Sequence, residues 1–181
     1  MRRAEPLSSA GPRPNQSRFC HAGAAGVALW LCLLTTAAVA NPSCGVSTPG
    51  LNFGGYDVFA AGAVNGNGTL SVTCNLNPPP SGNTTINYIV SLSTGSSNSF
   101  VQRQMQSGAN TLGYNLYTSN TYSVVWGDGT GSTATLSGSM RLSNGHQSET
   151  DGLTVYGQIP PLQDAGVGNN YLDNVTVTVS Y

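Results

Sequence analysis

Short runs in which apolar and polar residues alternate recur along this chain and constrain its fold more than any other feature. Residues 175–181 read Val-Thr-Val-Thr-Val-Ser-Tyr and place four apolar side chains on one side of an extended segment. A period of two is typical of a β-strand with one buried face. The same pattern, rich in the β-branched residues that favour strands, occurs at residues 70–74, 86–92, 112–116 and 153–159. The sequence therefore predicts an all-β protein.

Turn-forming residues separate these runs and predict turns at Asn65–Gly68, Pro78–Gly82 and Asn144-Gly145. Asp128-Gly129 predicts a hairpin between residues 122–126 and 132–140. No sustained helical period occurs in residues 41–181, although residues 102–108 could form one helical turn. About seven strands in one domain predict an antiparallel sandwich of the immunoglobulin-like class.

Residues 1–40 are predicted to be a signal peptide that is cleaved on export. Four of the six basic residues precede an uncharged, mostly apolar stretch at residues 22–40, which ends in the small-x-small pattern Ala38-Val39-Ala40. The alternative is a retained membrane anchor, but the dense apolar segment is short for a span. We therefore expect cleavage after Ala40, a single domain over residues 41–181 and no membrane span after cleavage.

Charge is scarce throughout the chain, which limits the classes of function. Charged residues make up 7% of the sequence, and lysine does not occur. Residues 41–181 carry two arginines, Arg103 and Arg141, against six acidic residues, a net charge of −4. Binding to nucleic acid through basic patches is therefore excluded.

Two cysteines, Cys44 and Cys74, lie in the predicted exported domain. An even pair of cysteines in an exported domain is typical of a disulfide formed in an oxidising compartment. The alternative is two buried free thiols. We predict the disulfide, which would stabilise the domain by closing a long loop.

Candidate catalytic and metal-binding residues are few. His146 is the only histidine in residues 41–181, and Glu149 or Asp151 could orient it as a base, but no nucleophile motif accompanies it and a polar hairpin loop is the simpler interpretation. Asp128 supplies a single carboxylate to Trp126–Gly131, too few for a calcium loop of the helical type. We therefore expect no enzyme activity, no metal and no cofactor.

Several sequence blocks follow one another in the order of a known family: Cys44-Gly45-Val46, Leu51–Gly54, Val72-Thr73-Cys74, Arg103 with Met105, Tyr114-Asn115-Leu116-Tyr117, Trp126–Gly129, Tyr156–Pro160 with Gln163, Tyr171-Leu172-Asp173 and Val175–Tyr181. In this order they resemble the spore coat protein U domain family, which includes archaic chaperone–usher pilins of the Csu type. The resemblance covers essentially all of residues 44–181.

The resemblance implies an incomplete immunoglobulin-like fold that lacks one strand. The missing strand would leave an apolar groove, filled first by a periplasmic chaperone and later by the N-terminal extension of a neighbouring pilin subunit delivered through an outer-membrane usher. The last strand would border this groove. The partner-binding residues that it implies are Val175, Val177, Val179 and Tyr181, which we expect to be largely buried.

The implied partner strand would pair with the outer backbone edge of that last strand. We expect the outward N–H groups to belong to one or more of Thr176, Thr178 and Ser180. The implied route is export through the periplasm to the cell surface, as a pilus or coat subunit.

One departure from the family pattern bears on assembly. Cleavage after Ala40 leaves only Asn41-Pro42-Ser43 before Cys44, too few residues for a donor strand. We therefore expect a fibre tip or terminator, or a coat-type protein that assembles differently.

Two further alternatives stay open: a self-completed coat or matrix protein, and a carbohydrate-binding adhesin module in which Trp126 and the tyrosines form a stacking platform.

Overall fold

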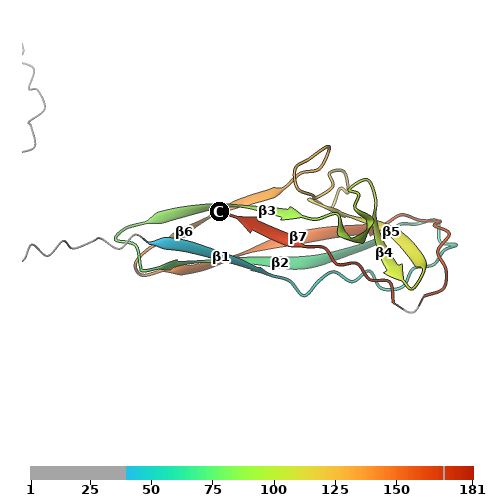
Figure 1. Ribbon diagram of the computed structural model, residues 1–181, viewed down its shortest axis with the longest axis horizontal. Coiled ribbons are helices and arrows are strands. Elements are labelled where there is room, and N and C mark those ends of the chain that lie inside the picture. The colour runs from blue at the N-terminus through green and yellow to red at the C-terminus, as the bar shows by residue number, and fades with distance from the viewer. Residues whose placement is uncertain (1–39, 169) are drawn as a thin grey trace, which may run out of the picture. The chain divides into compact units, whose positions relative to one another are not determined.

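The computed structural model describes residues 40–168 and 170–181. The predicted signal peptide therefore lies outside the described residues, apart from Ala40. Eight strands and one short 3-10 helix form the domain (Figure 1): β1 Asn41–Ser47, β2 Val64–Asn77, β3 Thr84–Leu92, η1 Gly95–Ser97, β4 Arg103–Ser107, β5 Asn110–Tyr117, β6 Leu136–Leu142, β7 Ser148–Ile159 and β8 Val177–Ser180.

The strands form two antiparallel sheets, which confirms the predicted all-β sandwich. The five-stranded sheet has the order β1-β2-β7-β5-β4, and the three-stranded sheet has the order β6-β3-β8. Strands β1 and β8 are therefore edge strands of different sheets. They lie beside each other on the same side of the sandwich, as the blue and red segments in Figure 1 show.

The core lies between the sheets and is built by the alternation seen in the sequence. In β2 the buried residues are Leu70, Val72, Cys74 and Leu76, and β3 supplies a matching set with the same spacing. The intervening residues of β2 face outward. One face of each strand is therefore apolar and the other polar, as a sheet with one solvated face requires.

Three local predictions were wrong. Asn65–Gly68 does not form a turn, because it continues β2 and pairs with residues 155–158 of β7. Glycine is needed there for packing: a Cβ on Gly66 would lie 3.0 Å from Leu51 Cδ2, and one on Gly68 would lie 2.8 Å from the carbonyl oxygen of Gly50.

The other two wrong predictions concern residues 102–108 and the hairpin at Asp128-Gly129. Residues 103–107 form β4 and no helical turn. Trp126 and Ala134 form an isolated parallel bridge, so the two segments of the predicted hairpin do not form an antiparallel ladder. Tertiary packing of the Trp126 side chain decides this conformation over the local turn signal.

The predicted disulfide is present. Cys44 and Cys74 lie opposite each other in the β1–β2 register, and their sulfur atoms are 2.05 Å apart. The bond fastens the edge strand β1 to its neighbour β2 in the five-stranded sheet.

Removing this disulfide is expected to cost about 3–4 kcal/mol of the free energy of unfolding in the Cys44→Ala/Cys74→Ala double variant. The disulfide joins residues with a sequence separation of 30, and the loss of that constraint raises the entropy of the unfolded chain. Denaturant unfolding measures the change, and Ser43→Ala on the exposed side of β1 is the matched control. Two reactive thiols in the unreduced native protein would contradict the prediction.

Candidate strand-binding groove

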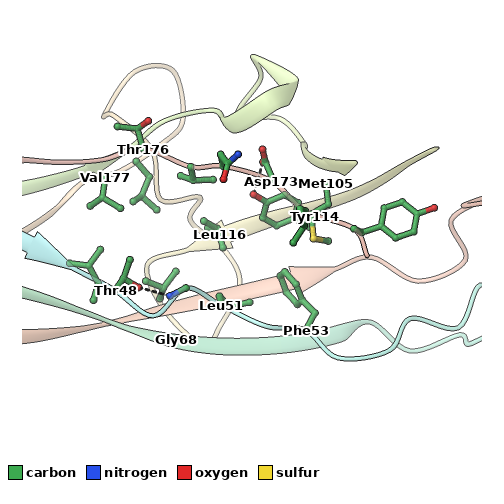
Figure 2. A pocket seen from close by; sticks show the side chains of 18 residues that line it. Thr48, Leu51, Phe53, Gly68, Met105, Tyr114, Leu116, Asp173, Thr176 and Val177 are labelled. Carbon is green, nitrogen blue, oxygen red and sulfur yellow. Dashed lines mark hydrogen bonds between the residues drawn. The ribbon is translucent and has the colours of Figure 1, made fainter. Parts of the chain in front are cut away.

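An apolar groove runs between the segment that follows β1 and the segment that leads into β8. Two adjoining cavities of about 330 and 720 Å³ form it. They share five lining residues: Leu51, Phe53, Met105, Tyr171 and Leu172. Figure 2 shows Leu51 and Phe53 on one side of the smaller cavity and Val177 and Asp173 on the other, with Leu116 between them.

The floor of the groove is the inner face of the five-stranded sheet. Leu70 of β2, Val155 of β7 and Leu116 of β5 supply it. All three belong to the hydrophobic core. The groove therefore opens directly beside buried residues of the core.

The free backbone edge of β8 borders this groove. The Ser93 N–H donates to the carbonyl of Thr176 (2.9 Å), whereas the Leu92 N–H donates to Gly127 on the other side of β3 (3.0 Å). Along two antiparallel strands, hydrogen-bonded residue pairs alternate with pairs that are not hydrogen-bonded. Ser91 lies opposite Thr178, two residues from the bonded pair Ser93 and Thr176, so it belongs to the hydrogen-bonded set. Thr176, Thr178 and Ser180 are therefore the residues that bond to β3.

The predicted assignment of outward N–H groups was therefore wrong by one residue. The N–H groups of Val177 and Val179 point away from β3, toward the free edge. The sequence could not fix this parity, because either set of alternate residues can face the neighbouring strand.

The four predicted partner-binding side chains lie at the groove and beyond it. Val175 and Val177 line the smaller cavity, and both are half-buried against the core together with Val179. Tyr181 is 54% exposed. The expectation that all four are largely buried was therefore wrong, most clearly for Tyr181, because it lies beyond the end of β8.

A polar latch holds the segment that leads into β8. Asp173 accepts hydrogen bonds from the Tyr114 hydroxyl (2.7 Å) and from the N–H (2.8 Å) and hydroxyl (2.7 Å) of Ser96. Burial and the hydrogen bond to Asp173 raise the pKa of Tyr114, so its hydroxyl stays protonated and donates. Gly95 makes room for the latch, because a Cβ there would meet the carboxylate of Asp173.

Arg103 braces the wall of the groove from inside the domain. Its side chain is fully buried and donates to Ser93 O (3.0 and 2.8 Å), Asn115 Oδ1 (2.7 Å) and Trp126 O (2.8 Å). Burial lowers the pKa of Arg103, and the nearby Asp173 acts in the opposite direction. The guanidinium group thereby ties β4 to the end of β3 and to the Trp126 segment.

The chain matches the Spore Coat Protein U domain family over residues 30–178. The chain belongs to this family. No curated protein matches it. A similar solved structure is the CsuC–CsuE chaperone–tip adhesion subunit pre-assembly complex from the archaic chaperone–usher Csu pili of Acinetobacter baumannii. That match has 21% sequence identity and a TM-score of 0.47, and it covers 78% of this chain and 40% of that chain.

The family resemblance predicted from the sequence is therefore confirmed, and several of its residues prove to be structural. In this spore coat protein U domain, Gln163 receives the Gly113 N–H (2.8 Å) and donates to the Gly113 carbonyl (2.8 Å), so its amide acts as a strand partner for β5. Tyr56 accepts the Gln163 N–H (2.8 Å) and donates to Pro160 O (3.1 Å). These contacts fix the loop at one end of the groove.

The remaining candidate residues do not form a site. His146 is exposed in the β6–β7 turn, whereas Glu149 accepts the Arg141 N–H and Asp151 accepts the Tyr88 hydroxyl. Asp128 binds the N–H and hydroxyl of Thr130, and these hydrogen bonds lower the pKa of its exposed carboxyl.

Trp126 is fully buried, and its Nε1 donates to Val90 O (3.0 Å), so it cannot act as a sugar platform. Within the described ranges no cluster of three or more metal-ligating side chains is found. In the same part of the chain no helix combines the length and apolarity needed to cross a membrane.

Proposed function

We propose that this chain is a non-enzymatic surface subunit of pilus or coat type, assembled by accepting a β-strand from a partner protein. The open apolar groove beside the free edge of β8 carries the proposal. A strand laid along this edge would hydrogen-bond to outward groups such as the Val177 N–H. Its alternate side chains would fill the two cavities, the usual basis of strand addition.

A groove of this kind creates a need for a chaperone. It presents exposed apolar side chains, Leu172 and Val167, and an unpaired strand edge in the same region, a combination that promotes aggregation. We propose that a periplasmic chaperone fills the groove first and that a neighbouring subunit replaces it at an outer-membrane usher. The route is export through the periplasm to the cell surface.

The proposed position in a fibre is a terminal one. All residues of β1, from Asn41 onward, pair with β2, and the disulfide tethers the strand at Cys44. If the signal peptide is cleaved after Ala40, residues 41–47 already serve this domain and are not free to complete another. Intact mass of the exported protein tests the cleavage position, and a longer N-terminal segment would contradict the terminal placement.

The groove is tested with a matched pair of exposed leucines. Leu172 lines both cavities and is 63% exposed, whereas Leu162 is 64% exposed and lines neither. A charge at Leu172 would face the apolar side chains of a bound strand and lose hydration without gaining a partner. We expect Leu172→Asp to reduce co-purification of the cognate chaperone at least about tenfold, and Leu162→Asp to leave it unchanged.

The experiment also separates this function from its alternative. If the exported protein purifies as a soluble, monodisperse monomer with no partner, and Leu172→Asp behaves like Leu162→Asp, the domain is a self-completed coat or matrix protein. Equal capture of both variants by the chaperone would contradict the groove as its binding site.

A further inference from the structure

The eight tyrosines of the chain divide into groups by what their hydroxyls do. Four are structural, because their hydroxyls bond to other parts of the domain: Tyr56, Tyr88, Tyr114 and Tyr171. Tyr181 lies at the exposed end beyond β8. The hydroxyls of the other three, Tyr117, Tyr122 and Tyr156, have no hydrogen-bond partner among the described residues.

These three tyrosines lie together on the outward face of the five-stranded sheet. Tyr117 of β5 lies directly opposite Tyr156 of β7. The Tyr122 ring meets Tyr117 edge-on, with ring centroids 5.6 Å apart and an interplanar angle of 90°. All three side chains are partly exposed. We call this group the tyrosine patch.

The loop that carries Tyr122 is closed and holds its backbone in an uncommon conformation. The Thr118 N–H donates to Val124 O (3.1 Å) at the base of the loop. Tyr122 has a φ of 51°, in the left-handed region that bulky residues seldom occupy. Such conformations persist where the surrounding structure imposes them and are concentrated at functional sites.

Neutral amides border the tyrosine patch. Asn67 of β2 lies opposite Tyr156, and Gln158 donates to Asn65 Oδ1 (2.9 Å) one step further along the same two strands. Strands β1, β2 and β5 contain no charged residue. The two acids of β7, Glu149 and Asp151, are engaged with Arg141 N–H and the Tyr88 hydroxyl. The patch therefore combines aromatic rings with uncharged donors and acceptors.

We propose that the tyrosine patch binds a neutral oligosaccharide made of pyranose units. The C–H face of a pyranose ring is apolar and stacks on an aromatic ring, while its hydroxyls need neutral donors and acceptors at the rim. Tyr156 would provide the stacking surface, and Asn67 and the free tyrosine hydroxyls would bond to the sugar. Since β1, β2 and β5 carry no charged residue and the two acids of β7 are engaged by other groups, a neutral glycan fits better than an anionic one.

The proposal is independent of the strand-binding groove, because the patch and the groove use opposite faces of the same strands. Val155 and Leu116, which precede Tyr156 and Tyr117 in the chain, point into the groove.

A shallow surface such as the tyrosine patch binds a single sugar chain weakly. Repeated display on a surface would raise its avidity without new contacts.

Affinity electrophoresis of the full chain, exported and purified with any partner it retains, tests the site. The probes are hydroxyethylcellulose, xylan and galactomannan as neutral polysaccharides, with polygalacturonate as the anionic one. At least one neutral polysaccharide should retard the protein, and Tyr156→Ala should weaken that retardation about tenfold, as the loss of one stacking contact does. Thr73→Ala, on the same outward face but six residues along β2 from Asn67, is the matched control and should change nothing.

A second variant keeps the test decisive if Tyr156→Ala does not fold. Asn67 is exposed, so Asn67→Asp should fold normally while placing a charge at the rim and weakening retardation by the neutral glycan. Retardation by polygalacturonate alone, or by no polysaccharide, would overturn the proposal. So would a change in sedimentation of Tyr156→Ala without a change in retardation, because the patch would then be a contact between copies of the chain.

Discussion

Replacing Arg103 by methionine is expected to destabilise the domain by about 3–5 kcal/mol, a large part of the stability of a domain of this size. The methionine keeps most of the volume but removes every donor. Ser93 O and Trp126 O would then have no hydrogen-bond donor within the described residues, and Asn115 Oδ1 would keep only the Leu116 N–H (3.1 Å). Each unsatisfied buried acceptor costs roughly 1–3 kcal/mol. Denaturant unfolding of the exported protein measures the loss.

Arg141 provides the matched control, because it is the only other arginine in residues 41–181. It is exposed on β6, and Arg141→Met should change the free energy of unfolding by less than about 0.5 kcal/mol. Arg103→Lys should behave like Arg103→Met, since one ammonium group cannot reach acceptors that the planar guanidinium spans. Stability of Arg103→Met within 1 kcal/mol of the parent would refute the bracing role.

The sequence predicted the repeating part of this fold well, because alternation reports directly on which residues face the core. Residues 86–92 and 153–159 were expected to be strands, and they lie within β3 and β7. The disulfide followed from the number of cysteines and the predicted export. These features depend on local pattern and composition, which can be read directly from the sequence.

Predictions from glycine and turn signals were less successful where tertiary packing competes. Gly66 and Gly68 sit in a strand because the segment at Gly50–Phe53 packs against them, and glycine serves close approach as well as turns. The buried Trp126 side chain holds its segment against the core, so the residues around Asp128-Gly129 do not form a regular hairpin. Contacts between residues far apart in sequence decided both cases.

The groove itself could be anticipated only through the family resemblance. Its lining comes from segments between Thr48 and Val177, and no single stretch of sequence shows that these segments meet around a cavity. The role of Arg103 was missed for the same reason, since its partners are 10 to 23 residues away. The available signal was the scarcity of charge: Arg103 is one of two arginines in residues 41–181. An arginine that is buried in such a domain needs several acceptors.

Val177→Pro is expected to abolish partner capture while leaving the domain folded. Val177 lines the groove, and its N–H points away from β3, so proline there removes no hydrogen bond within the domain. The same change removes a donor that a partner strand would use and places a ring against it. Capture of the cognate periplasmic chaperone, measured by co-purification, should fall at least about tenfold.

Two further variants separate the backbone effect from other causes. Val177→Ala removes the side chain but keeps the N–H, so chaperone capture should stay much closer to that of the parent protein. Thr178→Pro removes an N–H that bonds to Ser91 of β3, so it should lower the stability of the domain itself, measured by unfolding. If Val177→Pro and Val177→Ala are captured equally, the partner does not pair with the backbone of β8, and the strand must enter the groove along the β1 side.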